Sequence, residues 1–288
     1  MIGFIRFLFV IISVGCSCHC FTHTLTQVAR TEVNVSLTEP ALWLSAATQC
    51  SKDEYMTRTF MGPTTGFVTT SVIYDAHSDT TGFIGYLPSD QTIFVVFRGT
   101  TSVKNTITDI DAFKTDYVSY PECNCQVHEG FYKAEQRVIE QVIRDVKALQ
   151  AMETLQGYGV VVSGHSLGAA VAHLTAMDLI KNGIDCSCIN FGMPRTGTAE
   201  YSSFSSQQLQ TLRYTHYQDI VPHVPFEEVM TFHHVCTEMY EDESGAVKFC
   251  DSTCEDQSCA DQWDLRETNG DDHCMYLGLA ICSCGAVS

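Results

Sequence analysis

A serine between two glycines is the residue of this sequence best placed to do chemistry. Residues 160–172 read VVVSGHSLGAAVA, so a β-branched apolar run becomes a run of small residues at Ser166. Gly164 and Gly168 permit a sharp turn from strand to helix, and the first N–H groups of that helix can stabilise developing negative charge. The pattern predicts Ser166 as the nucleophile of a G-x-S-x-G elbow, with His165 as a packing residue. The alternative is a glycine turn with an incidental serine.

A serine hydroxyl becomes nucleophilic only beside a base. In folds that carry the nucleophile on such an elbow, the chain order is Ser, then Asp or Glu, then His. Asp219, in QDIVPHVP, stands where a strand ends and prolines begin, so it is the candidate acid or else a helix or turn cap. We expect the base on a mobile, partly exposed loop at the rim of the site, which fits His273 in NGDDHCMYLG. Spacing alone does not separate it from the other candidates, which are His216, His223, His233 and His234.

The elements that must position these residues alternate between strand-like and helix-like patterns. Alternation of this kind predicts a mostly parallel sheet with helices on its faces, and ligands then bind outside the carboxyl ends of the strands. The longest helical pattern, residues 130–152, has Val138, Val142, Val146 and Leu149 on one stripe. The other expected helices are 40–50 and 167–183, and the expected strands lie within 65–76, 81–100, 159–164, 186–192 and 211–217.

Length, composition and charge limit the classes of protein. The chain has 288 residues, 45% of them hydrophobic, which is enough for one large domain, and no linker or repeat divides it. The net charge of −18 repels nucleic acid and anionic lipid headgroups, so neither is an expected electrostatic partner.

The first 20 residues have the layout of a secretory signal peptide. Arg6 precedes the apolar run 7–14, and small residues follow. That run is too short to span a bilayer, and the alternative is an uncleaved interfacial anchor. We therefore expect a secreted, extracellular protein with a signal peptide over 1–20 and a single domain over 21–288. The acceptor Asn34-Val35-Ser36 predicts N-glycosylation.

Cysteines are frequent enough to act as a framework. Three of the 15 lie within residues 1–20, and the 12 that remain form an even set, which predicts disulfides behind a signal peptide. The rival interpretation is structural zinc. The recurring C-x-C spacing differs from the usual C-x-x-C of zinc sites, so no metal is expected. The C-x-C pairs are Cys123/Cys125, Cys186/Cys188 and Cys282/Cys284.

Several stretches, taken in chain order, resemble the motifs of one known family. LWLSAATQC is similar to its N-terminal helix and cysteine, TGFIGYLPSDQTIFVVFRGTTS to its oxyanion strand and turn, and VHEGFYKA to the start of its long helix. GHSLGAA, NFGMPRTG, QDIVPHVP and DHCMYLG are similar to its nucleophile, Phe-Gly-x-Pro-Arg-x-Gly, acid and base motifs. Together they make the chain resemble the fungal-type class 3 lipases, the triacylglycerol-lipase family of the α/β-hydrolase fold.

The resemblance implies both the fold and the roles of the site residues. The fold would be that of an α/β-hydrolase, a mostly parallel central sheet flanked by helices, with a helical lid after the oxyanion turn. Ser166 would be the nucleophile, Asp219 the orienting acid and His273 the general base. The backbone N–H of Leu167 and the N–H and hydroxyl of Thr100 would form the oxyanion hole. No cofactor and no metal are implied.

The segment after the oxyanion turn, TSVKNTITDIDAFKTDY, places Val103, Ile107 and Ile110 on one helical stripe. From the residues alone this is a short surface helix that rests on the core, whereas in the family it is the lid. The implied partner is a lipid ester at an oil–water interface, without nucleic acid and without a transmembrane anchor. Many relatives have Asn-Trp here, but this chain has Asn105-Thr106, which weakens the expectation of a triglyceride preference.

The function expected from these features is that of a secreted serine ester hydrolase, foremost an acylglycerol lipase. Phospholipase A1 and phenolic-ester esterase remain alternatives with the same triad, and so does a non-catalytic lipid-binding protein that retains the fold. The resemblance also suggests that Cys50 pairs with Cys282 or Cys284. We expect Arg98 and Arg195 to be structural ion-pair partners.

Overall fold

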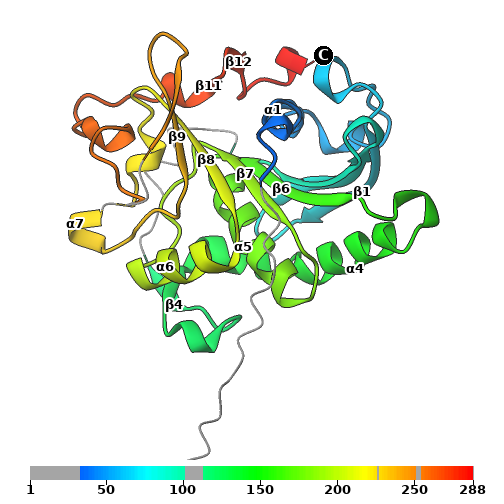
Figure 1. Cartoon of the computed structure of the whole chain (residues 1–288), viewed down its shortest axis with the longest axis horizontal. Coiled ribbons are helices and arrows are strands. Elements are labelled where there is room, and N and C mark those ends of the chain that lie inside the picture. Colours follow the sequence, from blue (N-terminus) through cyan, green and yellow to red (C-terminus); the bar gives the residue numbers. More distant parts are fainter. Residues whose placement is uncertain (1–32, 101–112, 226, 251–253, 288) are drawn as a thin grey trace, which may run out of the picture.

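An eight-stranded sheet forms the centre of the protein, with its strands in the order β1-β2-β3-β6-β7-β8-β9-β10 (Figure 1). The computed structural model describes residues 33–100, 113–225, 227–250 and 254–287. The signal peptide expected over 1–20 lies outside these residues, and so does the lid stripe expected at Val103, Ile107 and Ile110.

The middle of the sheet is parallel and its edges are antiparallel. The strands β3 (Thr92–Phe97), β6 (Gly159–His165), β7 (Ser187–Phe191), β8 (Thr211–His216) and β9 (Glu238–Glu241) pair in parallel. β1 (Val68–Asp75), β2 (Thr80–Leu87) and β10 (Val247–Phe249) add antiparallel pairs at the two edges. Small hairpins outside this sheet are β4 (Lys114–Asp116) with β5 (Gln126–His128), and β11 (Met275–Tyr276) with β12 (Leu279–Ala280). The predicted mostly parallel sheet is therefore confirmed.

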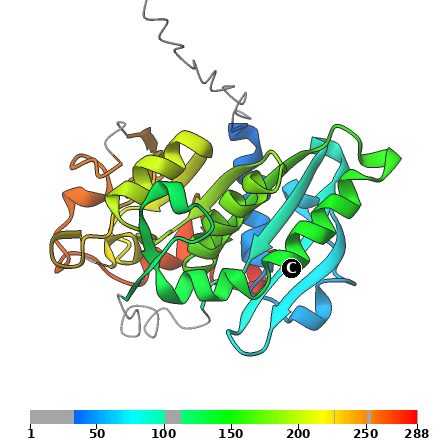
Figure 2. The same cartoon turned by 90° about the horizontal axis from the view of Figure 1, so that it is seen from below.

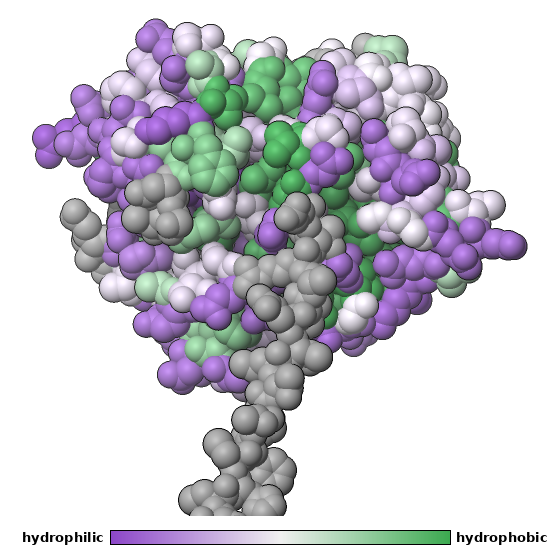
Figure 3. All heavy atoms as spheres, viewed as in Figure 1, coloured by the Kyte–Doolittle hydropathy of each residue, from purple (hydrophilic) through white to green (hydrophobic). Residues whose placement is uncertain are grey.

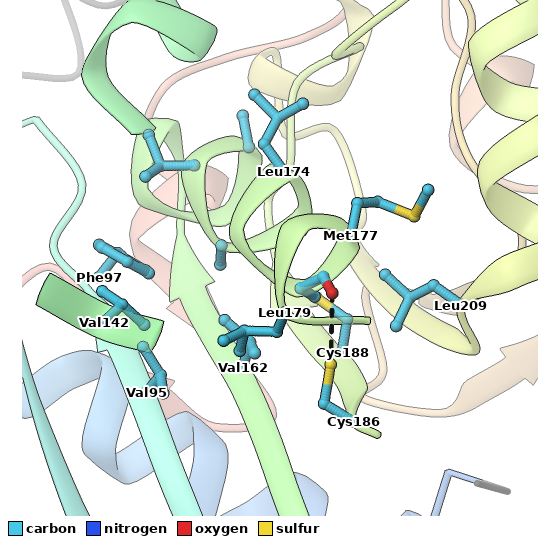
Figure 4. Packing of buried hydrophobic residues seen from close by; sticks show 14 of the residues in the cluster. Val95, Phe97, Val142, Val162, Leu174, Met177, Leu179, Cys186, Cys188 and Leu209 are labelled. Atoms are coloured by element: carbon cyan, nitrogen blue, oxygen red, sulfur yellow. Dashed lines mark hydrogen bonds between the residues drawn. The ribbon is translucent and has the colours of Figure 1, made fainter. Parts of the chain in front are cut away.

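Helices cover both faces of the sheet because the central strands are apolar on both sides. Val95 and Phe97 of β3 pack toward α3 (Glu129–Gln136), α4 (Ile139–Gln150), α5 (Leu167–Lys181) and α6 (Ala199–Gln208), as Figure 4 shows in part. Phe94 and Val96 alternate with them and pack toward α1 (Thr38–Ala47). Figure 1 shows α1 on the opposite side of the sheet from α4, α5 and α6, and Figure 2 shows α4 crossing in front of the cyan strands. A last short helix, α7, spans Glu227–Met230.

The single helix predicted over residues 130–152 is wrong in one respect, because two helices occupy this stretch. α3 ends at Gln136 and α4 begins at Ile139. Between them the N–H of Val138 donates to the carbonyl of Glu135, a turn one residue tighter than an α-helix. The buried side chains Val138, Val142, Val146 and Leu149 still lie in one core cluster, so the apolar stripe was identified correctly across the break.

Five disulfides join ten of the cysteines in the described part of the chain. Cys50 pairs with Cys284, which confirms the link suggested between the two ends of the domain. The others are Cys123–Cys125, Cys236–Cys254, Cys250–Cys259 and Cys274–Cys282. Cys186 and Cys188, near the start of β7, are buried free thiols.

Replacing Cys50 and Cys284 together by serine is expected to lower the free energy of unfolding by about 5 kcal/mol, because this bridge closes a loop that contains most of the domain. The bridge spans a separation of 234 residues, whereas Cys250–Cys259 spans 9, so the matched double serine variant there should lose only about 3 kcal/mol. Urea unfolding of the two variants beside the wild type measures both values. Equal losses would contradict the loop-length explanation.

Two carboxyl groups share a buried site between α3 and α5. Glu135 is fully buried, and the side-chain amide of Gln136 donates to its Oε2 (2.8 Å) and to Oδ2 of Asp178 (3.1 Å). Burial, and then the Asp178 carboxylate, raise the pKa of Glu135 well above its usual range. Burial also raises the pKa of Asp178, against hydrogen bonds from Ser119, Gln136 and Tyr117 and the charge of Lys181. At a pH between the unfolded and the folded pKa of Glu135, the folded protein therefore keeps a proton that the unfolded chain has released.

Glu135→Gln is expected to flatten the dependence of stability on pH above about pH 4, where an unfolded glutamate ionises. Because the folded pKa is raised, the folded state binds more protons than the unfolded state above that pH. Stability then falls as pH rises, by up to about 1.4 kcal/mol per pH unit, until Glu135 ionises in the folded protein. Urea unfolding between pH 4 and 9 measures the slope, and Glu140→Gln on the exposed face of α4 is the control. Identical slopes in all three proteins would rule out this linkage.

Candidate active site

Ser166 stands at a strained turn between β6 and α5. Its backbone has φ 59° and ψ −132°, a conformation that residues other than glycine rarely adopt. The turn is tight because a Cβ on Gly164 would lie 2.5 Å from the carbonyl of Gly168, and one on Gly168 would lie 2.5 Å from the carbonyl oxygen of Phe97. Only glycine fits at both positions, so G-x-S-x-G forms the strand–turn–helix that the sequence predicts.

Asp219 and His273 form a buried hydrogen-bonded pair. Nδ1 of His273 lies 2.8 Å from Oδ2 of Asp219 and 3.0 Å from Oδ1. Oδ1 also accepts from the N–H of Val221 (2.8 Å), and Oδ2 accepts from the hydroxyl of Tyr276. Burial raises the pKa of Asp219, but the His273 charge and the hydrogen bonds from His273 and Tyr276 outweigh it, so the pKa is lowered. An ionised carboxylate fixes the proton of His273 on Nδ1 and leaves Nε2 as the basic nitrogen.

Two consecutive residues, Phe191 and Gly192, contact Ser166 and His273 in turn. The N–H of Ser166 donates to the carbonyl of Phe191 at the end of β7 (3.0 Å), and the following residue, Gly192, lies against the imidazole of His273. A Cβ on Gly192 would come within 2.8 Å of His273 Cε1. His273 Nε2 is buried and has no hydrogen-bond partner among the described residues, so it is free to accept a proton.

His165 supports this arrangement from the residue before Ser166. Its Nε2 lies 2.9 Å from the carbonyl oxygen of His273, and the two ring centroids are 4.3 Å apart. Burial, and then the neighbouring His273, lower the pKa of His165 to about 3, so the ring is neutral and Nε2 can donate. The packing role predicted for His165 is therefore confirmed, with a hydrogen bond that the sequence did not reveal.

The sequence predicts His273 on a mobile, partly exposed loop at the rim of the site. This prediction is wrong. The residue is fully buried, on a short 3-10 helix (Asp272–Cys274). The disulfide Cys274–Cys282 follows it directly, and backbone bonds of Asn269 to Gln218 and Ile220 tie its loop to that of Asp219. These links fix the loop that carries the ring in place.

The other histidine candidates have different partners. His216 Nδ1 lies 2.9 Å from the carbonyl oxygen of Asp272, His234 Nε2 lies 2.7 Å from that of Pro222, and His233 pairs with Glu227 at 3.4 Å. Burial, and then Arg195, lower the pKa of His223 to about 4. Among the histidines of the described ranges, His273 is the one hydrogen-bonded to Asp219.

The two residues expected to form the oxyanion hole lie close to Ser166 in the chain or through a neighbour. Leu167 is the first residue of α5, where N–H groups have no partner within the helix. Thr100 follows Gly99, and a Cβ on Gly99 would lie 3.0 Å from Cβ of Ser166. The chain therefore reaches Thr100 directly beside the elbow, and the segment that follows it lies outside the described residues.

The two arginines act as ion-pair partners, as predicted. Arg98 pairs with Asp79 (3.0 Å), and buried Arg195 pairs with Glu255 (2.8 Å) and Asp261 (3.1 Å). Tyr276 is a site residue that the analysis of individual residues missed. The signal was the spacing of DHCMY, which places this tyrosine three residues after His273.

Two groups of side chains in the described ranges are close enough together to hold a metal ion. In the first, Glu238 stands beside Cys250 and Cys259, whose sulfurs are joined in a disulfide. In the second, Glu227, His233 and Glu255 are neighbours, but Arg195 already binds both carboxylate oxygens of Glu255. Within the same described ranges, the helices lack the length and apolar character needed to cross a membrane.

Known proteins are similar to this chain in sequence and in fold. Residues 94–229 match the family model described as lipase (class 3). Lipases of Rhizopus niveus and Rhizomucor miehei are 31% and 30% identical to the chain over 72% and 70% of its length. The solved structure of lipase II from Rhizopus niveus superposes with a TM-score of 0.78 at 26% identity, covering 88% of this chain and 98% of that one.

The chain belongs to the class 3 lipase family. The lipase from Rhizopus microsporus var. chinensis also superposes, with a TM-score of 0.77 at 28% identity over 88% of this chain and 91% of that one. These superpositions confirm the α/β-hydrolase fold that the motifs of the chain imply. The matches to the curated sequences cover 53% and 56% of those lipases, so the chain spans about half the length of the curated relatives it matches.

Proposed function

We propose that this class 3 lipase family member is a secreted serine ester hydrolase that cleaves acylglycerols. The observation that carries the proposal is the buried Asp219–His273 pair, which has its free Nε2 beside a strained Ser166. Secretion is supported by the expected signal peptide, by the five disulfides, and by a related protein of Penicillium camembertii named as a secreted mono- and diacylglycerol lipase.

The proposed reaction proceeds through an acyl-enzyme. His273 Nε2 takes the proton of the Ser166 hydroxyl while Oγ attacks the ester carbonyl carbon, and Asp219 stabilises the imidazolium that forms. The N–H groups of Leu167 and Thr100, together with the Thr100 hydroxyl, hold the oxyanion, and the intermediate collapses as His273 returns the proton to the leaving alcohol. Water, deprotonated by the same histidine, then attacks the acyl carbonyl and releases the fatty acid with Ser166 restored.

Acylglycerol at an oil–water interface is the substrate we infer. The apolar stripe of Val103, Ile107 and Ile110 would cover the site in water and turn outward against lipid, where exposing it costs little. Phospholipase A1 and phenolic-ester esterase use the same triad and remain the alternatives. A non-catalytic lipid-binding protein would have no need of a buried acid–base pair beside a strained serine.

Covalent labelling tests the nucleophile directly. A fluorophosphonate should react with the purified protein at Ser166 alone, and peptide mapping should find the adduct on the peptide that contains GHSLGAA. The labelled protein should lose hydrolysis of a short-chain chromogenic ester in proportion to the adduct. Hydrolysis that survives complete labelling, or an adduct on another serine, would refute the assignment.

The interfacial part of the proposal has a separate test. The rate of hydrolysis of one ester is measured as its concentration passes the solubility limit. A jump at that limit is expected for the wild type, and Ile107→Asp should reduce the jump because a charge disfavours contact of the stripe with lipid. Smooth saturation in the wild type would leave an esterase with the same triad but without interfacial activation.

Thr100→Val is expected to lower kcat by about 10²–10³-fold with a much smaller change in KM, because one oxyanion donor acts mainly in the transition state. Thr100→Ser keeps the hydroxyl and is the matched control, which should stay near the wild-type kcat. Steady-state kinetics on a soluble ester measure both. An unchanged kcat in Thr100→Val would show that the backbone N–H groups form the hole without the hydroxyl.

A further inference from the structure

A pocket opens at the same edge of the sheet as the candidate active site. It has a volume of about 680 Å³, within the usual range of ligand pockets, and it lies between the β9–β10 hairpin and residues 258–263. β9 runs parallel to β8, so the hairpin turn emerges at the carboxyl edge where Ser166 and Asp219 also lie. Tyr217, which lines the pocket, precedes Asp219 by two residues.

The wall of this pocket is anchored by buried contacts. Glu238 accepts from Arg213 (3.1 Å), from Thr215 (2.6 Å) and from the N–H of Ala260 (3.1 Å). Asp261, the next residue, pairs with Arg195, and the disulfides Cys236–Cys254 and Cys250–Cys259 brace the same segment. Gln262 and Trp263, which follow directly, are therefore held in position without a ligand, as a preorganised site requires.

Aromatic rings and uncharged polar groups dominate the pocket. Trp263 meets Tyr217 edge to face at 5.2 Å, and its indole N–H donates to the hydroxyl of Tyr240 (3.0 Å). Trp263 and Tyr217 are half-buried, so part of each ring remains accessible. Around them lie an amide, hydroxyls, carboxylates and one ammonium, which belong to residues such as Gln262, Ser258, Glu243 and Lys248.

This mixture disfavours an anionic ligand. Lys248 donates to the carbonyl and hydroxyl of Ser258, so its ammonium already has partners. Oδ1 of Asp242 accepts from the N–H groups of Ser244 and Ala246 and closes the hairpin turn. The chain's net charge of −18 repels anions. A neutral ligand ring that carries hydroxyls at its rim and C–H groups on its face would match this pocket, because the aromatic side chains here are flanked by hydrogen-bond donors and acceptors.

We propose that this pocket binds a neutral saccharide, either as the headgroup of a glycolipid or as a free glycan. Hydrophilic residues predominate at the upper left of Figure 3, where Figure 1 places the β9–β10 hairpin. The family match ends at residue 229, so nearly all of the pocket is built from chain beyond it. The glycolipid form of the proposal rests on the proposed ester hydrolysis, whereas saccharide binding itself does not.

The first experiment measures binding without catalysis. Methyl glucoside, methyl galactoside and disaccharides of glucose and galactose are titrated into the full protein, and binding is followed by calorimetry and by tryptophan fluorescence. Fluorescence is informative because the chain has only two tryptophans, Trp43 and Trp263. Gln262→Ala and the exposed Glu243→Gln should each weaken saccharide binding at least tenfold, while Asp53→Asn on a remote surface should not change it. Trp43→Phe should keep the fluorescence change, and Trp263→Phe should lose it.

The second experiment distinguishes the two sources of saccharide. Hydrolysis of galactosyl diacylglycerol is compared with that of diacylglycerol of the same acyl chains, both in phosphatidylcholine vesicles. A kcat/KM preference of about tenfold for the glycolipid, carried by KM and reduced by Gln262→Ala, identifies a headgroup site. Binding of free saccharides without such a preference identifies a glycan site.

Other outcomes overturn the proposal. Absence of binding to free saccharides together with absence of a glycolipid preference would do so, as would binding that the pocket variants leave unchanged. Calcium binding that Glu243→Gln abolishes, with no saccharide effect, would assign the pocket to a cation. A wild type that hydrolyses no ester would refute the proposed function, but the saccharide titrations would remain readable.

Discussion

Ser166→Ala is expected to lower kcat on a soluble ester by about 10⁶-fold while the protein stays folded. The hydroxyl is the atom that would form the acyl-enzyme, so its removal leaves only the oxyanion donors and substrate binding. The fold should persist because the backbone of the elbow is held by the close approach of Gly164 and Gly168 and by the bond from the Ser166 N–H to Phe191. The measurement is single-turnover and steady-state hydrolysis, with circular dichroism as the check on folding.

A serine on the same strand provides the control for this variant. Ser163 is buried three residues earlier, where its hydroxyl donates to the carbonyl of Ile189. Ser163→Ala makes the same chemical change and should affect stability while kcat stays within a few-fold of the wild type. If Ser166→Ala retains more than a small fraction of the activity after clean purification, another group is the nucleophile.

Asp219→Asn is expected to reduce kcat by about 10⁴-fold, the second-largest effect. The amide can donate to Nδ1 of His273, which favours the tautomer with its proton on Nε2, and that nitrogen can then no longer take the serine proton. The loss of charge also removes the stabilisation of the imidazolium in a site that is closed to water.

Tyr276→Phe serves as the matched control for Asp219→Asn. It removes one hydrogen bond to the Asp219 carboxylate and keeps the charge, so its kcat should fall far less. Hydrolysis of one soluble ester by the three proteins ranks them. Equal losses in Asp219→Asn and Tyr276→Phe would indicate that the hydrogen-bond network, and not the carboxylate charge, is what matters.

The elbow was predictable because its signals are local. A β-branched run, two glycines and a helix-forming run around Ser166 specify strand, turn and helix within a few residues. The pairing of Asp219 with His273 was not local, because 54 residues separate them and several other histidines follow the serine motif closely enough to compete. The family resemblance supplied that choice, and His273 is the histidine of the described ranges that is hydrogen-bonded to Asp219.

The features that the sequence did not predict depend on tertiary packing. β9 and β10 are too short to show alternation, and all three residues of β10 are exposed. α6 has a mainly polar sequence, AEYSSFSSQQ, without an apolar stripe. The burial of His273 arises from the neighbouring loops and the Cys274–Cys282 bridge, and the residues around it show neither those loops nor the partner of Cys274.

The two free thiols of β7 bear on how the bridges form. Cys186 lies against the carbonyl of Ala176 in α5, and Cys188 accepts from the side-chain amide of Asn190. Burial raises the pKa of both thiols, so in the folded protein they are poor nucleophiles for disulfide exchange. In the unfolded chain nothing distinguishes them from the cysteines that do pair. During oxidative folding, packing of β7 therefore competes with disulfide formation. β7 must be enclosed between β6, β8 and α5 before either thiol forms a disulfide with a non-native partner.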